Sequence, residues 1–300
     1  MTVDAQEPSK KRAGVTAIVT AWRRIDQTLA AIARIRACEP APDEVLVHVD
    51  GNESECAAAI RKAFPDVAVL ESADSVGPGG GRNKLIEAAR NELAASFDDD
   101  SYPIDADYFA RVEFLFERFP EAALIGASIF HRHEPEPAAA RLATRTGSFT
   151  GCGAVYRRSA FLGGGGYVPL PIAYAMEEED LALRLLDQGK VMLFSPWLRV
   201  FHDTDLSHHG NPRITAAQIA NTALLAFLRY PARYWPYGAA QVLNRAIWSV
   251  RHGRSQGVAV GLAQIPRHLW RHRELRRPVS AGAVRAKLRG RVPGLQTYDF

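Results

Sequence analysis

The first hundred residues alternate between short β-branched runs and segments with helical spacing, and this alternation restricts the fold more than any other feature. The expected strands cover residues 15–20, 43–50, 67–70 and 93–97. The segments between them repeat apolar residues at helical spacing, as in residues 25–38. Strands that alternate with helices favour an α/β protein whose parallel sheet is covered by helices on both faces.

The pattern changes after residue 100. We expect helices at residues 105–119 and 177–189, strands at 122–130, 191–196 and 199–202, and a bent strand or hairpin with glycine turns at 144–161. The remainder of the chain is expected to be helical and basic, with tyrosine and tryptophan interleaved.

Charge is distributed unevenly along the chain. The formal net charge is +4, yet residues 229–300 contain 14 arginines and lysines against two acids, Glu274 and Asp299. The rest of the chain is therefore mildly acidic, and we expect the two parts to have separate roles. The basic part could meet anionic lipid, nucleic acid or an acidic face of the same chain.

The composition is that of a soluble globular enzyme, with 47% apolar and 23% charged residues. The sequence contains no apolar stretch of 18 residues, so we expect no membrane-spanning helix. The first residues lack the apolar run of a secretory signal. Three scattered cysteines, Cys38, Cys56 and Cys152, predict neither a disulfide framework nor a zinc site. We therefore expect a cytoplasmic protein.

Three adjacent aspartates follow the fourth expected strand. Asp98, Asp99 and Asp100 repel one another, and Asp50 ends the second strand at the same edge of the sheet. Ligands of such sheets bind at the carboxyl ends of the strands. Divalent cations such as Mg²⁺ or Mn²⁺ take carboxylate ligands together with substrate phosphates. The triplet therefore predicts a nucleotide and metal site, with a solvated turn before Pro103 as the alternative.

A glycine-rich segment, GPGGGRNK at residues 77–84, precedes the third expected helix. Glycines let the backbone approach a ligand closely, and a helix N-terminus favours an anion, so we expect Arg82 near phosphates. The segment matches neither the dinucleotide fingerprint nor the Walker A loop. A flexible loop that enters a helix is the alternative.

The acids at residues 177–180 open a helix, where the helix dipole alone would stabilise them. A carboxyl group crowded by others has a raised pKa, which suits a general base. Asp180 and Arg184 are spaced for an i,i+4 ion pair, which would make Asp180 structural. Histidines follow: His202 could be a ligand or a structural residue, and His208 and His209 are expected in a loop near the mouth of the site.

Taken in order, these motifs resemble the family 2 glycosyltransferases, which have the GT-A fold, a Rossmann-like mixed sheet flanked by helices. The motifs are VTAIVTAWRR, DEVLVHVDGN, GPGGGRNKLIEAA, FDDDSYP, TGCGAVYRRSAFLGGGGY, EEEDLALRLL and VFH, and they span about residues 14–205. The resemblance implies a GT-A domain at residues 14–210, after a flexible N-terminus at residues 1–13. A helical, basic extension at residues 211–300 follows and carries no motif of the family.

The resemblance implies an inverting, metal-dependent hexosyltransferase. It would move a sugar from a nucleotide-sugar donor, with a UDP-sugar favoured, to the hydroxyl of a glycan, a lipid-linked glycan or a small molecule. Mn²⁺ or Mg²⁺ would be the cofactor. We expect no nucleic-acid partner, and the basic extension could contact the inner face of the membrane peripherally.

The resemblance also assigns roles to residues. It implies that the nucleotide-sugar is held by Thr20, Ala21, Arg23, Asp50, Arg82, Asp98 and Asp99, the metal by Asp100 and His202, and the sugar or acceptor by Gly151, Cys152 and Glu177. The family's base pattern, set on DLALR, makes Glu178 the general base, a glutamate in place of the family's aspartate. Glu179 is the second choice.

Two other functions stay open. A sugar-nucleotidylyltransferase also uses a glycine-rich loop and a metal-bound aspartate, but its loop would follow the first strand, where TAWRRI stands here. A non-catalytic scaffold at the membrane surface could use the basic, aromatic C-terminal part alone.

Overall fold

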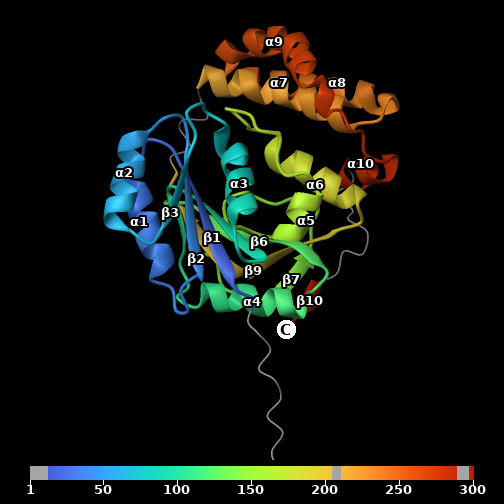
Figure 1. Ribbon diagram of the computed structural model, residues 1–300. Helices are drawn as coiled ribbons and strands as arrows, with labels where there is room; N and C mark the ends of the chain where they lie inside the picture. The colour runs from blue at the N-terminus through green and yellow to red at the C-terminus, as the bar shows by residue number, and fades with distance from the viewer. Residues whose placement is uncertain (1–12, 205–210, 289–296) are drawn as a thin grey trace, which may run out of the picture.

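The computed structural model describes residues 13–204, 211–288 and 297–300. Figure 1 shows a sheet with helices on both faces and a further layer of helices, α7 to α9, beyond one end of the strands. Of the segment expected to be flexible, residues 1–12 lie outside the described residues, as do His208 and His209.

The first half of the sheet is parallel, as the alternation of elements predicts. Its strands are β1 (Val15–Ala21), β2 (Glu44–Val49), β3 (Ala68–Glu71) and β4 (Leu93–Asp98), and its helices are α1 (Ile25–Arg36), α2 (Ser54–Ala63) and α3 (Gly77–Ala88). β1 pairs in parallel with both β2 and β4, and β2 pairs in parallel with β3. β1 is buried at almost every position, which agrees with its mostly apolar, β-branched sequence.

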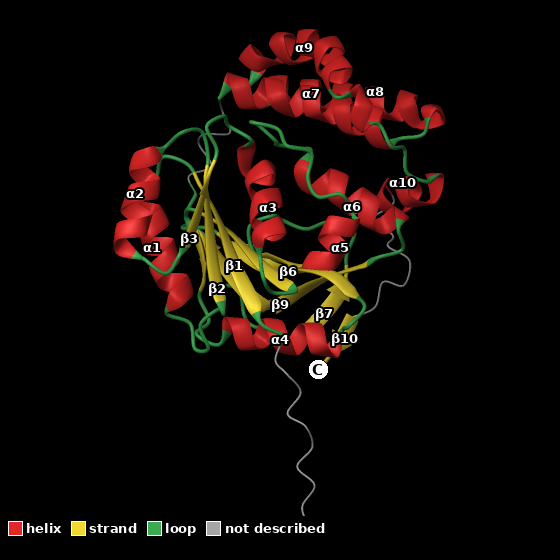
Figure 2. Cartoon of the chain, in the orientation of Figure 1, coloured by secondary structure: helices red, strands yellow, loops and turns green. Residues whose placement is uncertain are grey.

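The second half of the sheet is mixed. Its strands are β5 (Ser101–Pro103), β6 (Ala122–Phe130), β7 (Leu142–Arg145), β8 (Ala154–Arg157) and β9 (Val191–His202). The helices along this part of the chain are α4 (Tyr108–Arg118), α5 (Arg158–Gly163) and α6 (Glu177–Asp187). The strand order is β10-β7-β9-β6-β8-β4-β1-β2-β3, and β5 pairs with β9. β8 runs antiparallel to both of its neighbours, β4 and β6. The mixed sheet flanked by helices is confirmed (Figure 2).

Three expectations about the elements are wrong. Residues 144–161 form no hairpin, because β7 and β8 are separated by a loop and pair with different strands. Residues 191–202 form one strand instead of two, and a register shift against β6 accommodates Pro196. The glycine-rich segment is part of α3, which begins at Gly77.

The C-terminal part is largely helical, as expected. Its helices are α7 (Pro212–Arg229), α8 (Trp235–Arg251), α9 (Val258–Arg271) and α10 (Ala281–Leu288). The sequence did not predict the strand β10 (Thr297–Asp299), which pairs antiparallel with β7. Among the described residues, no helix combines the length and apolar character that a membrane span requires.

Hydrophobic clusters join the sheet to its helices on both faces. Side chains of α1, α2 and α4 pack on one face, and those of α3, α5 and α6 pack on the other. A third cluster joins α6, α7 and α10, so the C-terminal helices are packed against the sheet-bearing part through α6.

A buried ion-pair network reinforces this junction. Asp180 of α6 is completely buried and accepts hydrogen bonds from Arg184, one turn later, and from Arg229 at the end of α7. The predicted Asp180–Arg184 ion pair is therefore confirmed, with an N–O distance of 2.6 Å. The structure adds Arg229, which also donates to the carbonyl oxygen of Leu275.

Replacement of Asp180 by alanine should lower the free energy of unfolding by about 3–5 kcal/mol, because it leaves the buried guanidinium of Arg229 without a counter-charge. Urea denaturation measures this loss. Asp66→Ala is the control, since its ion pair with Arg36 lies at the surface, where the Asp66 side chain is 67% exposed. That change should cost less than about 1 kcal/mol, and equal losses in the two variants would contradict the structural role of Asp180.

Candidate active site

The aspartate run begins where β4 ends beside β1. Thr20 lies opposite Asp98 in the register of these strands, and its hydroxyl donates to Oδ1 of Asp98 at 3.1 Å. The buried guanidinium of Arg82 donates to the same oxygen and, through Nε, to the hydroxyl of Ser96 at 2.9 Å. Thr20, Arg82 and Asp98, which the sequence assigned to one site, are therefore in direct contact.

Arg24 joins the other two aspartates. Its guanidinium donates to Asp99 and to Asp100, each at 2.5 Å. The backbone N–H of Trp22 also donates to Asp99, at 3.1 Å. Burial raises the pKa of Asp99 to about 7, although Arg24 opposes the increase. Asp99 and Asp100 thus share one cation from the turn after β1.

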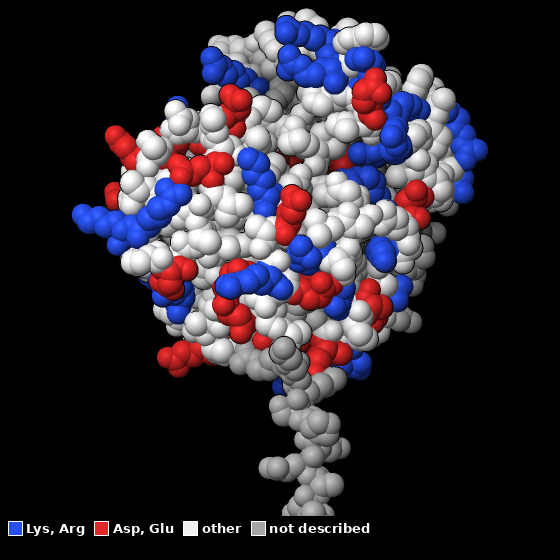
Figure 3. All heavy atoms as spheres, in the orientation of Figure 1, with Lys and Arg blue, Asp and Glu red and all other residues white. Residues whose placement is uncertain are grey.

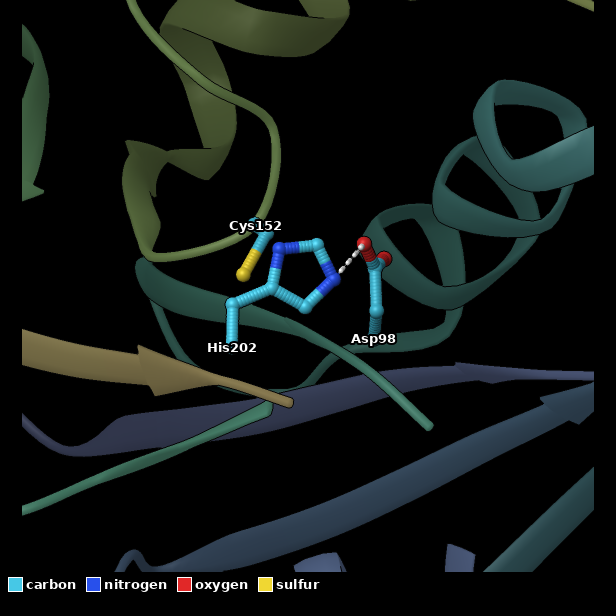
Figure 4. A group of neighbouring side chains, drawn as sticks. All are labelled: Asp98, Cys152 and His202. Atoms are coloured by element: carbon cyan, nitrogen blue, oxygen red, sulfur yellow. Dashed lines mark ion pairs between the residues drawn. The ribbon is translucent and has the colours of Figure 1, made fainter. Parts of the chain in front are cut away.

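His202 ends β9 on the other side of the triplet. Its Nε2 lies 3.1 Å from Oδ1 of Asp100 and 3.8 Å from Oδ2 of Asp98. Burial lowers the pKa of His202, but contact with Asp100, Cys152 and Asp98 outweighs this effect and raises the pKa to about 11. Figure 4 shows Nε2 directed at Asp98 and the sulfur of Cys152 beside the opposite edge of the ring.

These side chains offer donor atoms for a cation. One donor atom from each of Asp98, Cys152 and His202 lies within 4.8 Å of the others. In addition, Oδ1 of Asp100 is buried, and the atom that faces it in the described part of the chain is Nε2 of His202, at 3.1 Å. Carboxylate donors suit Mn²⁺ and Mg²⁺, and the imidazole of a neutral histidine is a common metal ligand. The residues therefore fit a divalent cation.

The four acids that open α6 have four different environments. Glu177 is buried, accepts from the N–H of Gly79 at 2.6 Å and lies 3.6 Å from Arg82. Burial raises the pKa of Glu177 to about 8, although Arg82 opposes this. Glu178 accepts from the N–H of Gly151 at 3.1 Å.

The last two acids of the run face the C-terminal helices. Glu179 is 41% exposed and pairs with Lys287 of α10 at 2.8 Å. Asp180 belongs to the network with Arg184 and Arg229 described above. Among the acids at residues 177–180, Glu178 is therefore the one that accepts from the N–H of Gly151.

Glu178 and the aspartates border the same space. A Cβ placed on Gly151 would lie 3.1 Å from Oε1 of Glu178 and 3.2 Å from the guanidinium carbon of Arg82, which in turn holds Asp98. Burial raises the pKa of Tyr174, and the negative charges of Asp98, Asp100 and Glu178 add to this effect. Tyr174 therefore lies near both sets of acids.

Asp50 and the glycines have roles that the sequence analysis did not assign. The carboxylate of Asp50 accepts from Ser75 at 2.7 Å, from the N–H of Val76 at 2.9 Å and from the N–H of Gly77 at 3.1 Å. A Cβ on Gly79 would lie only 2.4 Å from Glu177. Gly79 therefore allows α3 to approach the start of α6 closely, and Asp50 caps the start of α3.

The turn after β1 contains the residue that the sequence analysis missed. Arg23, which was expected to line the nucleotide pocket, pairs with Glu53 at 2.8 Å and has a side chain that is 66% exposed. Arg24 instead reaches Asp99 and Asp100. The backbone of Arg23 has a φ of 66°, so the chain turns sharply there. The two adjacent arginines in AWRR indicate that one of them could reach the aspartates. Which one does so depends on the turn at Arg23, and the sequence pattern does not reveal that turn. Ala21 is buried and accepts from the N–H of Asp50 at 3.0 Å.

Residues 12–168 match the model of a family described as Glycosyltransferase like family 2. No curated protein matches the chain significantly.

Solved structures with a similar fold bind nucleotides or nucleotide-sugars. GalNAc-T7 with UDP, GalNAc and Mn²⁺ has a TM-score of 0.57 at 12% identity, over 89% of this chain and 59% of that one. The mannosyltransferase PcManGT from Pyrobaculum calidifontis, with GDP-Man and Mn²⁺, has a TM-score of 0.57 at 17% identity, over 93% and 79%. TarS from S. aureus with UDP-GlcNAc has a TM-score of 0.56 at 14% identity, over 77% and 72%.

These likenesses concern the fold, and this chain spans only 59% of the length of GalNAc-T7. The family model, by contrast, matches more than half of the chain in sequence. The chain belongs to the Glycosyltransferase like family 2 and has the GT-A fold.

Proposed function

We propose that the protein transfers a sugar from a nucleoside-diphosphate sugar to an acceptor hydroxyl, by a single displacement with inversion at the anomeric carbon. The observation that carries this proposal is the division of the site's acids into two sets. Asp98 and Asp100 meet His202 at the strand ends, whereas Glu178 stands apart at the start of α6. A metal-dependent displacement needs one carboxylate set for the cation and a separate carboxylate for the base.

The cation would be held by Asp98, Asp100 and His202, with the sulfur of Cys152 at the edge of this set. When bound, it supplies Lewis-acid stabilisation of the charge that develops on the leaving diphosphate. Arg24 and Arg82 fix the carboxylates before any ligand arrives, because each donates to an aspartate of the triplet. The pre-set geometry avoids reorganisation during the reaction.

Glu178 would accept the proton of the acceptor hydroxyl as that oxygen attacks the anomeric carbon. The N–H of Gly151 holds one of its oxygens, which orients the carboxylate. The neighbouring Glu177 accepts from the N–H of Gly79 and lies beside Arg82. These contacts would fix the start of α6 and therefore the position of Glu178. Glu179 is less suited to the role, because its partner is Lys287 on α10.

We further propose a UDP-sugar as the donor, with Mn²⁺ or Mg²⁺ as the cation. Two of the similar solved structures contain UDP or UDP-GlcNAc, and a third contains GDP-Man. Within this site, Thr20, which donates to Asp98, would border the ribose or base, and Tyr174 would border the sugar.

A thermal-shift series tests donor and metal together. We expect a UDP-sugar with Mn²⁺ to raise the melting temperature most, because a ligand at about 100 times its Kd stabilises the native state by about 2.7 kcal/mol. GDP- and dTDP-sugars serve as competitors. His202→Ala should remove the Mn²⁺-dependent part of the shift. If no nucleotide-sugar shifts the melting temperature with either metal, the transferase proposal fails.

Replacement of Glu178 by glutamine should lower kcat by about 10²–10⁴-fold, because the amide cannot accept the proton. The change in melting temperature with donor and Mn²⁺ should persist, since Glu178 is outside the cation set. Glu179→Gln is the matched control and should keep kcat within about twofold of the native value. A large loss in Glu179→Gln with little loss in Glu178→Gln would reverse the assignment of the base.

A further inference from the structure

Helix α8 is apolar on two sides, but only one of them is buried. Gly238, Val242 and Ala246 face inward, and Gly238 packs against Ala226 of α7. A second stripe, made of Leu243, Ile247 and Val250, is exposed, with Leu243 at 61%. Residues three and four apart lie on one side of a helix. The solvent-exposed side of a helix is normally polar, so an apolar stripe there is unusual. Because these three side chains are exposed, no part of the described chain covers them.

Helix α9 repeats the arrangement. Gly261 packs so closely on α7 that a Cβ there would lie 2.8 Å from the carbonyl oxygen of Ala216. Leu262, Pro266 and Trp270 are exposed at helical spacing, with Trp270 at 68%. We call the exposed stripes of both helices, together with the arginines beside them, the α8–α9 face; it consists of Leu243, Ile247, Val250, Leu262, Pro266, Trp270, Arg267 and Arg271.

The charge of this region has one sign. Between Trp235 and Arg271 the sequence contains five arginines and no acid. Arg267 and Arg271 are exposed on α9, and the guanidinium of Arg273 lies 3.9 Å from the ring centre of Trp270. Figure 3 shows mostly blue and white atoms over the helical layer, with a red patch toward its right side, whereas red and blue are interspersed over the sheet-bearing part. Exposed apolar stripes bordered by arginine and tryptophan are the chemistry of helices that lie in a membrane interface.

This layer also reaches the candidate active site. Asn221 of α7 donates its amide to the carbonyl oxygens of Ile172 at 2.9 Å and Tyr174 at 3.0 Å, in the loop that borders the acids. The amide oxygen of Asn221 lies 2.9 Å from Nε2 of His268 on α9. Helix α9 is therefore linked through Asn221 of α7 to the loop beside Glu178.

We infer that the α8–α9 face docks on an anionic membrane surface, with its apolar stripes in the headgroup region and its arginines against lipid phosphates. A second copy of the chain is a poorer occupant, because a symmetric contact would bring arginines against arginines. An anionic bilayer supplies both features that the face requires, the negative charge in its headgroups and the apolar boundary in its acyl chains. The inference goes beyond the proposed transferase reaction and does not depend on it.

Co-sedimentation with vesicles of phosphatidylcholine, with and without phosphatidylglycerol, tests the inference in the absence of donor. The native chain should bind the anionic vesicles, and rising salt should weaken this binding because the arginines contribute through screened charge. Leu243→Glu combined with Ile247→Glu should weaken binding by about tenfold or more, since two carboxylates would enter the apolar boundary. Arg267→Glu should weaken it by about fivefold or more.

Matched controls separate docking from general damage. Leu162 of α5 is 40% exposed outside the face, so Leu162→Glu should leave vesicle binding unchanged. Lys62→Glu on α2 is the corresponding charge control, because Lys62 is exposed. Melting temperatures near that of the native chain verify that the face variants are folded.

Three results would overturn the inference. The first is a native chain that ignores anionic vesicles at low salt. The second is vesicle binding that survives the changes in α8 and α9. The third is a dimer in sedimentation equilibrium that Leu243→Glu dissociates, without vesicle binding, since this would make the face a contact between copies.

Discussion

The balance of charge around three adjacent aspartates governs the carboxyl edge of the sheet. Carboxylates so close together destabilise a fold unless each has a positive or donating partner. Asp98 receives Arg82 and Thr20, Asp99 receives Arg24 and a backbone N–H, and Asp100 receives Arg24 and His202. These partners come from β1, α3, β9 and the turn after β1. The triplet at the end of β4 therefore determines where three separate segments must meet, namely β1 with its following turn, α3 and β9.

Much of the fold follows from the sequence, because periodicity is a local property. The four parallel strands lie within one residue of the ranges that their apolar patterns predict, and helices lie between them as expected. The mixed half was harder to predict, since β8 and β9 are defined by distant partners. Pro196 in particular read as the end of a strand, yet a register shift against β6 lets β9 continue past it.

The site was predictable in its members but less so in its contacts. Residues that follow strands gather at one edge of a sheet, which is why Thr20, Asp98 and His202 could be grouped in advance. The choice between Arg23 and Arg24 depended on one positive φ angle. The choice among the acids of α6 depended on which neighbour each meets, and Gly151 and Lys287 lie far from them in the sequence.

The hydrogen bonds of Asn221, which connects the helical layer to the site, determine which nitrogen of His268 carries a proton. Because its amide nitrogen donates to two carbonyl oxygens, its oxygen must accept, and His268 must present an N–H at Nε2. The neutral tautomer with hydrogen on Nε2 satisfies this, and burial, with His272 and Arg271 nearby, lowers the pKa of His268 to about 4. His268 therefore stays neutral across the neutral pH range. The locally lower pH at an anionic membrane surface would not protonate it, so the hydrogen bond to Asn221 would persist when the arginines meet lipid.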